Sequence, residues 1–384
     1  MLHDYCSMIV GIDGSRAFLP ERTGIEEYSY QVIRHLRDSL SSEPVFLYIR
    51  PEQAVDFDLP KNWQVKRLWA PRLWTQARLS LEMFFHPVDM LFIPAHTAPL
   101  IHPARTIVTI HGLEYEFCPE AYSFLERWYM RLSIRFSCTA ASMLIAVSEN
   151  TRRDLISLYG VPEEKIVVIS EGYEQNFQFP ISNFPAGAGP RQGGGQSNPN
   201  FQFSISKPYL LFIGRLEERK NVVRIIEAFE ILKEKYRIPH QLILAGKPGY
   251  GYEKIRLQIA DCRFKNDIQE LGYISEEKKW ELLRGAEIFV FPSLYEGFGI
   301  PVLEAQSVGT PVVTANTSSL PEVGGEGAVY ADPLSAESIA EEIQRVLSDD
   351  VFRSGIIEKG SENVKRFSWE SCSDQIGKRI MTRQ

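Results

Sequence analysis

Residues 288–313 read Ile288-Phe-Val-Phe-Pro-Ser-Leu-Tyr-Glu296-Gly-Phe-Gly-Ile-Pro301-Val-Leu-Glu304-Ala-Gln-Ser-Val-Gly309-Thr-Pro-Val-Val313, and they contain the clearest structural signal in the chain. The apolar run that opens it is typical of a buried parallel strand, and the apolar pair that closes it predicts a second one. Gly297 and Gly299 allow a tight turn and the close approach of a ligand. Pro301 suits the first turn of a helix that Gly309 ends. The stretch therefore predicts a strand, a glycine loop, a helix and another strand.

The glycine loop leads into a helix N-terminus that stands between two carboxylates. Backbone N–H groups at a helix N-terminus have no partner inside the helix and attract anions. Glu296 precedes the helix, and Glu304 lies one turn inside it. Amides suit a phosphate, and carboxylates accept hydrogen bonds from hydroxyl groups. The pattern favours a phosphate-linked sugar as ligand; an ordinary loop with two solvated glutamates is the alternative.

The spacing Glu296-x7-Glu304 resembles the signature of retaining GT-B glycosyltransferases of family 4. In that family the first glutamate contacts the donor sugar and the second holds the nucleotide ribose, and the resemblance implies these roles for Glu296 and Glu304. It also implies that the residues between them face the donor. These are Gly297, Phe298, Gly299, Ile300, Pro301 and Leu303.

Length and composition limit the classes of protein to consider. With 384 residues, 44% of them hydrophobic and 24% charged, the chain can form two domains with cores. A net charge of −7 argues against nucleic acid as the main partner. The five cysteines show no CxxC spacing, which indicates a reducing compartment and no metal site. We found no signal peptide and no membrane-spanning run, so we expect a cytoplasmic protein, soluble or peripheral on the inner face of the plasma membrane.

The first half of the chain alternates strands and helices, which predicts a parallel sheet. A helix is expected from 26 to about 40, where apolar residues recur at helical spacing. The loop before it, Gly11-Ile-Asp-Gly14-Ser-Arg16, lacks the G-x-G-x-x-G fingerprint, which weakens the interpretation as a dehydrogenase. Strands are expected at 7–12, 45–49, 89–93, 106–110, 141–147 and 166–169.

Two positions in this half match the same family. Thr23-Gly24-Ile25 resembles the start of the T-G-I-G-R-Y loop of mannosyltransferase-like members, which implies that Gly24 lies near the donor, although Glu-Glu-Tyr replaces G-R-Y here. His111 follows a strand, where ligands bind in open α/β sheets. The family places a catalytic-site histidine there, often as H-D-L, whereas Gly112 follows in this chain. A hydrogen-bonded structural histidine is the alternative.

Basic and aromatic residues are interleaved in two segments of the first half. The segments are 66–78, which includes Trp69 and Trp74, and 127–135, which includes Arg127, Arg131 and Arg135. Such a composition suits peripheral contact with an anionic membrane, with the two tryptophans inserted at the interface. The alternative is that the aromatic residues belong to the core and the arginines to a solvated helix face.

A glycine-rich stretch at 186–198 separates the two halves and is expected to act as a flexible linker. Near-identical segments flank it, at 176–182 and 200–206, and suggest a local duplication to which the sequence assigns no role. We expect four parts. They are an acceptor-side domain (1–172), the linker (173–207), a nucleotide-sugar domain (208–366) and a tail (367–384) resembling the GT-B helix that packs back on the first domain.

The second domain opens with an expected strand at 209–213, followed by Gly214-Arg215-Leu-Glu-Glu-Arg-Lys220-Asn221. Cations between a strand end and a helix N-terminus concentrate positive potential for a diphosphate. In the family, G-R-x4-K-N holds the donor diphosphate, which implies that role for Arg215 and Lys220, with Gly214 beside them; two solvated cations are the alternative. In the family, the loop after the strand expected here at 267–271 flanks the base, which implies that place for Tyr273. Two further strands are expected at 241–245 and 288–291.

The predicted fold is α/β with GT-B architecture, in which two Rossmann-like domains with parallel sheets face a central cleft. The resemblance implies a retaining hexosyltransferase that moves a sugar from a nucleotide diphosphate sugar to a hydroxyl of a growing glycan, in polysaccharide or O-antigen lipopolysaccharide biosynthesis. No D-x-D motif stands at the end of an expected strand in the metal-binding style, so we expect no metal and no other cofactor. The expected catalytic residues are His111, Arg215, Lys220 and Glu296.

The donor and acceptor are predicted only by class. The mannosyltransferase-like segments favour GDP-mannose, and UDP-sugars remain open. The acceptor would be a glycan, with a polyprenyl-linked one as the reason for membrane contact. The alternatives are a UDP-sugar transferase, an epimerase or a phosphorylase on the same fold, or an inactive nucleotide-sugar-binding protein.

Overall fold

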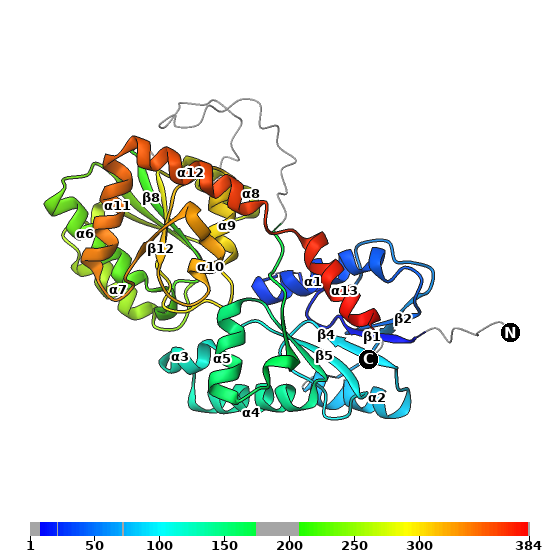
Figure 1. Ribbon diagram of the computed structural model, residues 1–384. Helices are drawn as coiled ribbons and strands as arrows, with labels where there is room; N and C mark the ends of the chain where they lie inside the picture. The colour runs from blue at the N-terminus through cyan, green and yellow to red at the C-terminus, as the bar shows by residue number, and fades with distance from the viewer. Residues whose placement is uncertain (1–7, 21, 71–72, 174–206, 383–384) are drawn as a thin grey trace. The chain divides into compact units, whose positions relative to one another are not determined.

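The computed structural model describes residues 8–20, 22–70, 73–173 and 207–382, which form two compact units (Figure 1). Unit 1 comprises Met1–Glu116, Ser123–Glu174 and Phe367–Gln384. Unit 2 comprises Phe117–Tyr122 and Gln175–Arg366. The duplicated segments 176–182 and 200–206 and the glycine-rich stretch between them lie outside the described residues.

Unit 1 is built on seven parallel strands in the order β3-β2-β1-β4-β5-β6-β7. The order reverses between β1 and β4, which are neighbours in the sheet. The edge strand β3 was not predicted, because only its alternate residues are apolar and the segment is rich in charge. The strands are β1 (Val10–Asp13), β2 (Val45–Ile49), β3 (Trp63–Arg67), β4 (Met90–Ile93), β5 (Arg105–Ile110), β6 (Met143–Ala146) and β7 (Ile166–Val168).

Helices cover the sheet of unit 1, and the last helix of the chain lies against the first (Figure 1). This last helix, α13, buries Trp369, Ile376 and Ile380, and the Arg105 guanidinium donates to the Ile380 carbonyl at 3.0 Å. The expected return of the tail to the first domain is therefore confirmed. The helical segments of this part are α1 (Gly24–Ser39), the π-helical turn η1 (Trp74–Leu79), α2 (Ser80–Phe85), α3 (Glu114–Phe117), η2 (Pro119–Ala121), α4 (Phe124–Ala140), α5 (Glu149–Tyr159), η3 (Glu163–Lys165) and α13 (Trp369–Met381).

Unit 2 contains six parallel strands in the order β10-β9-β8-β11-β12-β13, and this order reverses between β8 and β11. The central strands are apolar throughout and buried on both faces, as a parallel sheet requires. The predicted two α/β units with parallel sheets are confirmed. The strands are β8 (Tyr209–Ile213), β9 (Gln241–Ala245), β10 (Ile268–Gly272), β11 (Ile288–Phe291), β12 (Val312–Ala315) and β13 (Ala328–Ala331).

The helices of unit 2 surround its sheet (Figure 1). They are η5 (Glu218–Lys220), α6 (Val222–Lys235), α7 (Tyr252–Asp261), η6 (Lys265–Asp267), α8 (Glu276–Gly285), α9 (Ile300–Ser307), α10 (Leu320–Gly324), η7 (Gly325–Gly327), α11 (Ala336–Ser348) and α12 (Asp350–Val364). In the described part of the chain, none of the helices is both long and apolar enough to span a bilayer.

A glycine fixes the place where α13 joins unit 1. A Cβ added at Gly172 would lie 2.4 Å from the Trp369 backbone nitrogen, a distance that real Cβ atoms do not adopt. We expect Gly172→Ala to lower the free energy of unfolding by about 1–3 kcal/mol, the usual cost of overpacking. Denaturant unfolding followed by circular dichroism measures this. Gly355→Ala is the matched control, because a Cβ there meets nothing within 4 Å; equal losses in both variants would contradict the assignment.

Candidate functional site

The site in unit 2 lies where the strand order reverses. In open parallel sheets, ligands bind at the carboxyl ends of the strands at such a reversal, because the loops on either side diverge. The loop after β8 carries Gly214–Asn221, and the loop after β11 carries 292–299. The two stretches that the sequence singled out are therefore neighbours in space, although about 75 residues separate them in the chain.

Four charged side chains from these loops form one cluster: Glu217, Arg219, Lys220 and Glu296. Glu296 accepts from the Lys220 ammonium at 2.6 Å through Oε1 and from the Arg219 guanidinium at 3.1 Å through Oε2. Burial alone would raise the pKa of Glu296, but the charges of Lys220 and Arg219 outweigh it and lower this pKa to about 2. The carboxylate is thus ionised at neutral pH. Glu217 supplies a second carboxylate, 2.9 Å from the Arg219 guanidinium, so the two cations of the cluster face two anions.

Backbone contacts hold the two loops of this cluster together. Asn221 has left-handed backbone geometry (φ 62°), and its side-chain amide donates to the carbonyls of Pro292 at 3.0 Å and Pro333 at 2.7 Å. The Leu294 N–H donates to the Arg219 carbonyl at 2.9 Å. These bonds place Lys220 beside Glu296 before any ligand arrives, so the cluster is preorganised.

A third loop, after β12, fixes the backbone on the other side of Glu296. The Ser318 hydroxyl accepts from the Glu296 N–H at 3.1 Å. The hydroxyl of Ser319 lies 2.9 Å from the Glu296 carbonyl and 2.5 Å from that of Phe298. Gly299 follows with φ 120°, a conformation that favours glycine, and α9 begins at the next residue. The glycine loop thus has a defined shape.

Glu304 lies on α9, as expected, but it has a partner that the sequence did not reveal. The Lys279 ammonium on α8 contacts Glu304 Oε1 at 2.7 Å and Glu276 Oε2 at 2.7 Å. Burial alone would lower the pKa of Lys279, but the two carboxylates outweigh it and raise this pKa. Lys279 therefore orients the carboxylate that the sequence assigns to the ribose.

The remaining residues predicted to bind the donor differ in exposure, and so in how they could contact a ligand. Arg215 is exposed directly after Gly214, and Tyr273 is exposed with the Lys247 ammonium 4.5 Å from its ring centre. Phe298 and Leu303 are buried, so a donor can reach them only through the backbone. The partly exposed members of the loop and helix are Gly297, Ile300 and Pro301.

In unit 1, His111 follows β5 and is held on both sides. Its Nδ1 lies 3.0 Å from Glu171 Oε1, and its Nε2 lies 2.8 Å from the Pro94 carbonyl. The Tyr28 ring packs edge-on to His111 at 4.5 Å and to Trp369 at 5.9 Å, which links the histidine to α13. A sugar that contacts the imidazole must therefore replace one of these bonds, or use the adjacent backbone.

Other polar groups of unit 1 lie at the same carboxyl edge as His111. Asp13 ends β1, accepts from the Ser15 N–H at 2.9 Å and has a pKa that burial raises. His96, after β4, accepts from the His111 N–H at 3.3 Å, and burial lowers its pKa well below the usual value. Gly24 begins α1 in this unit. In the sequence, Asp13 and His96 could have been identified as polar residues at or just after the end of an expected strand.

Several residues of the site were missed from the sequence. Arg219 lies inside the G-R-x4-K-N motif from which Arg215 and Lys220 were predicted. It occupies one of the four unspecified positions, so the motif gave no reason to select it. Glu171 and Lys279 come from elements distant in sequence from their partners. Their contacts depend on the sheet order, which local patterns do not encode.

Comparison with known proteins adds an independent finding. The family described as Glycosyl transferases group 1 matches residues 198–363, and Glycosyltransferase Family 4 matches residues 23–176. The chain is 33% identical over 271 residues to O-antigen chain mannosyltransferase B of Escherichia coli, which covers 71% of this chain and 68% of the relative. It is 24% identical to O-antigen chain mannosyltransferase RfbU of Salmonella typhimurium, covering 83% of this chain and 78% of that protein.

Solved structures share the fold. Sucrose-phosphate synthase from Thermosynechococcus elongatus superposes with a TM-score of 0.70 at 18% identity, covering 97% of this chain and 98% of that one. WaaG, a glycosyltransferase involved in lipopolysaccharide biosynthesis, gives a TM-score of 0.69 at 17% identity, covering 98% and 100%. These two likenesses support the GT-B assignment of the two sheets.

The Glu296 cluster predicts a pH dependence of stability. The pKa of Glu296 is about 2 in the folded chain against an ordinary value of 4.5, so the ionised carboxylate stabilises the fold above pH 4.5, and this stability is lost as the pH falls towards 2. Between about pH 6 and about pH 3, wild type should lose roughly 2 kcal/mol more than Glu296→Gln. Urea unfolding at several pH values measures the free energy of unfolding of both proteins. If this free energy changes with pH in parallel in the two, the ion pair is contradicted.

Proposed function

The chain belongs to the group 1 glycosyltransferases, and we propose that it moves mannose from GDP-mannose to a sugar hydroxyl of a growing glycan with retention of configuration. Its membership makes it a hexosyltransferase that uses a nucleotide sugar. The choice of mannose is supported by the names of the relatives, which include O-antigen chain mannosyltransferases, and by the Thr23-Gly24-Ile25 segment. O-antigen polysaccharide synthesis is the proposed process.

The observation that carries the proposal is the cluster of Lys220, Arg219 and Glu296 at the strand reversal of unit 2. Lys220 and Arg219 are held there by Glu296 and Glu217 in a partly dry site, where electrostatic interactions are strong. A departing nucleoside diphosphate needs fixed cations beside it in the transition state. Lys220, the exposed Arg215 and the N–H groups at the start of α9 are proposed to receive it.

Glu296 and Glu304 have separate proposed roles. Glu296, fixed by the two cations and by Ser318, would accept hydrogen bonds from hydroxyls of the donor sugar next to the breaking bond. Glu304, oriented by Lys279, would accept from the ribose hydroxyls. His111 is proposed to act from unit 1, where Glu171 fixes its ring. Because the chain supplies its own cations, we propose that no divalent metal is required.

The acceptor is proposed to be a glycan carried on a polyprenyl lipid. This would bring unit 1 into peripheral contact with an anionic membrane at the inner face of the plasma membrane. The proposal is supported by the exposed aromatic residues of α2 and α4 in unit 1.

A donor screen tests the proposed function. GDP-mannose should raise the melting temperature more than UDP-glucose or dTDP-glucose, because binding to the native state stabilises it by mass action. GDP should then be released only with a glycan acceptor, and EDTA should leave the rate unchanged. A larger melting-temperature shift with a UDP-sugar would mean that the donor is that UDP-sugar and not GDP-mannose. Turnover without acceptor would favour an epimerase or phosphorylase, and binding without turnover an inactive binding protein.

Variants in the same assay test the diphosphate site. Lys220→Met and Arg215→Ala should each lower kcat/KM about 10²–10³-fold, the scale for losing one preorganised charge. Arg256→Ala is the matched control, because this arginine is exposed on α7 and pairs only with Glu253 among the described residues. Full activity in both site variants would refute the assignment.

A further inference from the structure

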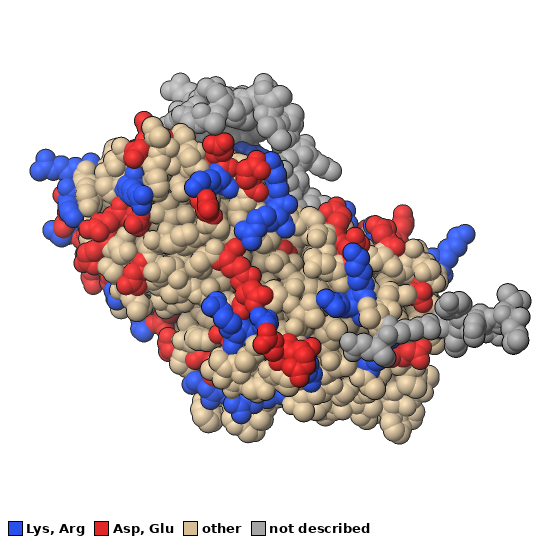
Figure 2. Space-filling model, viewed as in Figure 1, with Lys and Arg blue, Asp and Glu red and all other residues tan. Residues whose placement is uncertain are grey.

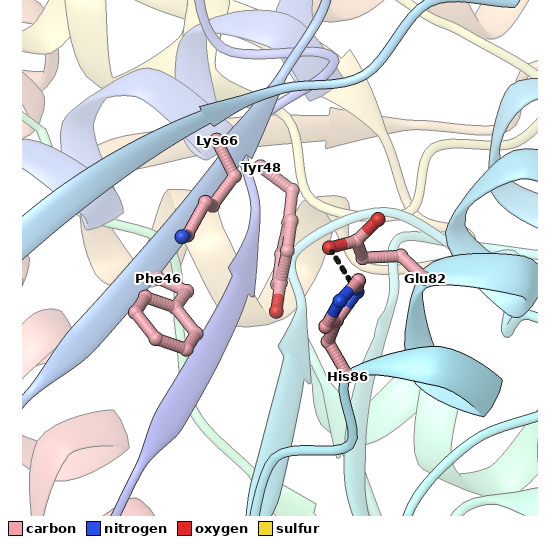
Figure 3. Close-up of a pocket in the computed structure, with 5 residues that line it drawn as sticks. All are labelled: Phe46, Tyr48, Lys66, Glu82 and His86. Carbon is pink, nitrogen blue, oxygen red and sulfur yellow. Dashed lines mark ion pairs between the residues drawn. The ribbon is translucent and has the colours of Figure 1, made fainter.

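Unit 1 contains a pocket that the proposed function does not use. Its volume is about 170 Å³, and it lies between the β2–β3 edge of the sheet and α2. A cavity of roughly 150 Å³ holds a six-membered ring such as benzene. The pocket is therefore large enough for a small cyclic ligand. The residues that line it are Phe46, Tyr48, Lys66, Glu82 and His86 (Figure 3).

The period of the strands brings three of these side chains together. Phe46 and Tyr48 are two residues apart on β2, so both leave the sheet on the same face. Lys66 on β3 is the register partner of Tyr48. The Phe46 and Tyr48 rings meet edge to face with their centres 6.5 Å apart, and the Lys66 ammonium lies 4.6 Å from the Phe46 ring centre. One side of the pocket thus consists of two aromatic rings and a cation.

Helix α2 and the residue after it supply the other side of the pocket. Glu82 and His86 are four residues apart, and His86 Nδ1 lies 3.2 Å from Glu82 Oε1. The Arg78 guanidinium donates to Glu82 Oε2 at 3.0 Å. Both oxygens of the carboxylate have partners, and Arg78 balances its charge. In Figure 3 the Tyr48 ring stands between Phe46 and the Glu82–His86 pair.

A buried tryptophan fixes the turn that leads into α2. Trp74 begins η1, and its indole N–H donates to the Leu68 carbonyl at 2.9 Å. The expected insertion of Trp74 at a membrane interface is therefore wrong. In Figure 2 the lower edge of unit 1, where Figure 1 places α2, shows few charged side chains. The α2 side of the pocket is thus anchored and carries little charge.

Two polar groups of the pocket have no partner in the described part of the chain. Tyr48 is 1% exposed, and its hydroxyl makes no hydrogen bond, which is costly for a buried group. Burial and the charge of Glu82 raise the pKa of Tyr48, so the hydroxyl keeps its proton and can donate. The Lys66 ammonium contacts the Phe46 ring but pairs with no carboxylate. Both groups are therefore available to an acceptor on a ligand.

We propose that this pocket binds a small cyclic carboxylate, in which the carboxylate is attached to a six-membered ring. The carboxylate accepts from the Lys66 ammonium and the Tyr48 hydroxyl, and the ring packs on the aromatic side chains. A neutral ring would leave the ammonium unpaired, and a small anion without a ring would leave the aromatic surface uncovered. Aromatic acids and uronic acids share this chemistry. The inference goes beyond the proposed function and does not depend on it.

Ligand-observed NMR titration of the full chain tests the proposal at constant ionic strength. The probes are benzoate, glucuronate, benzamide and acetate. Benzoate or glucuronate should bind saturably, and the tighter of the two identifies the kind of ring. Benzamide keeps the ring without the charge, and acetate keeps the charge without the ring. Each should therefore bind at least about ten-fold more weakly than the tighter ring acid.

Variants show whether the ring acid binds in this pocket. Lys66→Met removes the charge and should weaken binding at least about ten-fold, whereas Tyr48→Phe removes a neutral donor and should weaken it roughly two- to ten-fold. Lys61→Met is the matched control, because this lysine is exposed on the turn before β3. The melting shift induced by GDP-mannose should be the same in all variants. That shift reports separately on the proposed function, since none of these residues belongs to the donor site.

Tyr48→Phe also tests the protein without ligand. Because an unpaired buried hydroxyl is costly, its removal should leave the melting temperature unchanged or raise it. A lower melting temperature would mean that the hydroxyl has a partner within the chain, and would overturn the proposal. So would the absence of saturable binding of both ring acids, equal affinity for benzamide or acetate, or unchanged affinity in both pocket variants.

Discussion

The site in unit 2 depends on one buried cluster, in which Glu296 pairs with both Lys220 and Arg219, and Glu217 with Arg219. Without Glu296, Lys220 would lose its carboxylate partner in a partly dry site, which is costly. With it, the loops after β8 and β11 are joined and two cations are held in place for an anionic ligand. The same interaction therefore stabilises the fold at the strand reversal and prepares the site for a nucleoside diphosphate, so stability and function share one set of contacts.

Unit 1 follows the same topological rule with different chemistry. Its polar groups also gather at the carboxyl edge of the sheet, but His111 is held by Glu171 and the Pro94 carbonyl and is backed by Tyr28 and Trp369. The tail helix α13 thus helps to fix a residue more than 250 positions earlier in the chain. These contacts hold the imidazole of His111 in one orientation. A fixed orientation suits a histidine that positions a sugar, and it is equally expected of a histidine with a purely structural role.

Local sequence patterns predicted the helices and strands that can be recognised from their own residues. The apolar run, glycines and proline around Glu296 predicted β11, the loop and α9, and the two parallel sheets followed from the alternation of strands and helices. The edge strand β3 was missed because charge hides its alternation. Arg219 was missed because only the packed loops show that it reaches Glu296. Trp74 and Trp69 looked alike in sequence, yet one is buried and the other exposed, because burial depends on tertiary neighbours.

The central claim is that Glu296 serves the sugar while Glu304 serves the nucleotide. Isothermal titration of GDP and GDP-mannose into wild type, Glu296→Gln and Glu304→Gln tests it most directly. The account predicts that Glu304→Gln weakens both ligands, whereas Glu296→Gln leaves GDP affinity nearly unchanged and removes the additional affinity due to the mannose. A Glu296→Gln variant that weakens GDP and GDP-mannose equally, and so keeps the sugar preference, would contradict it.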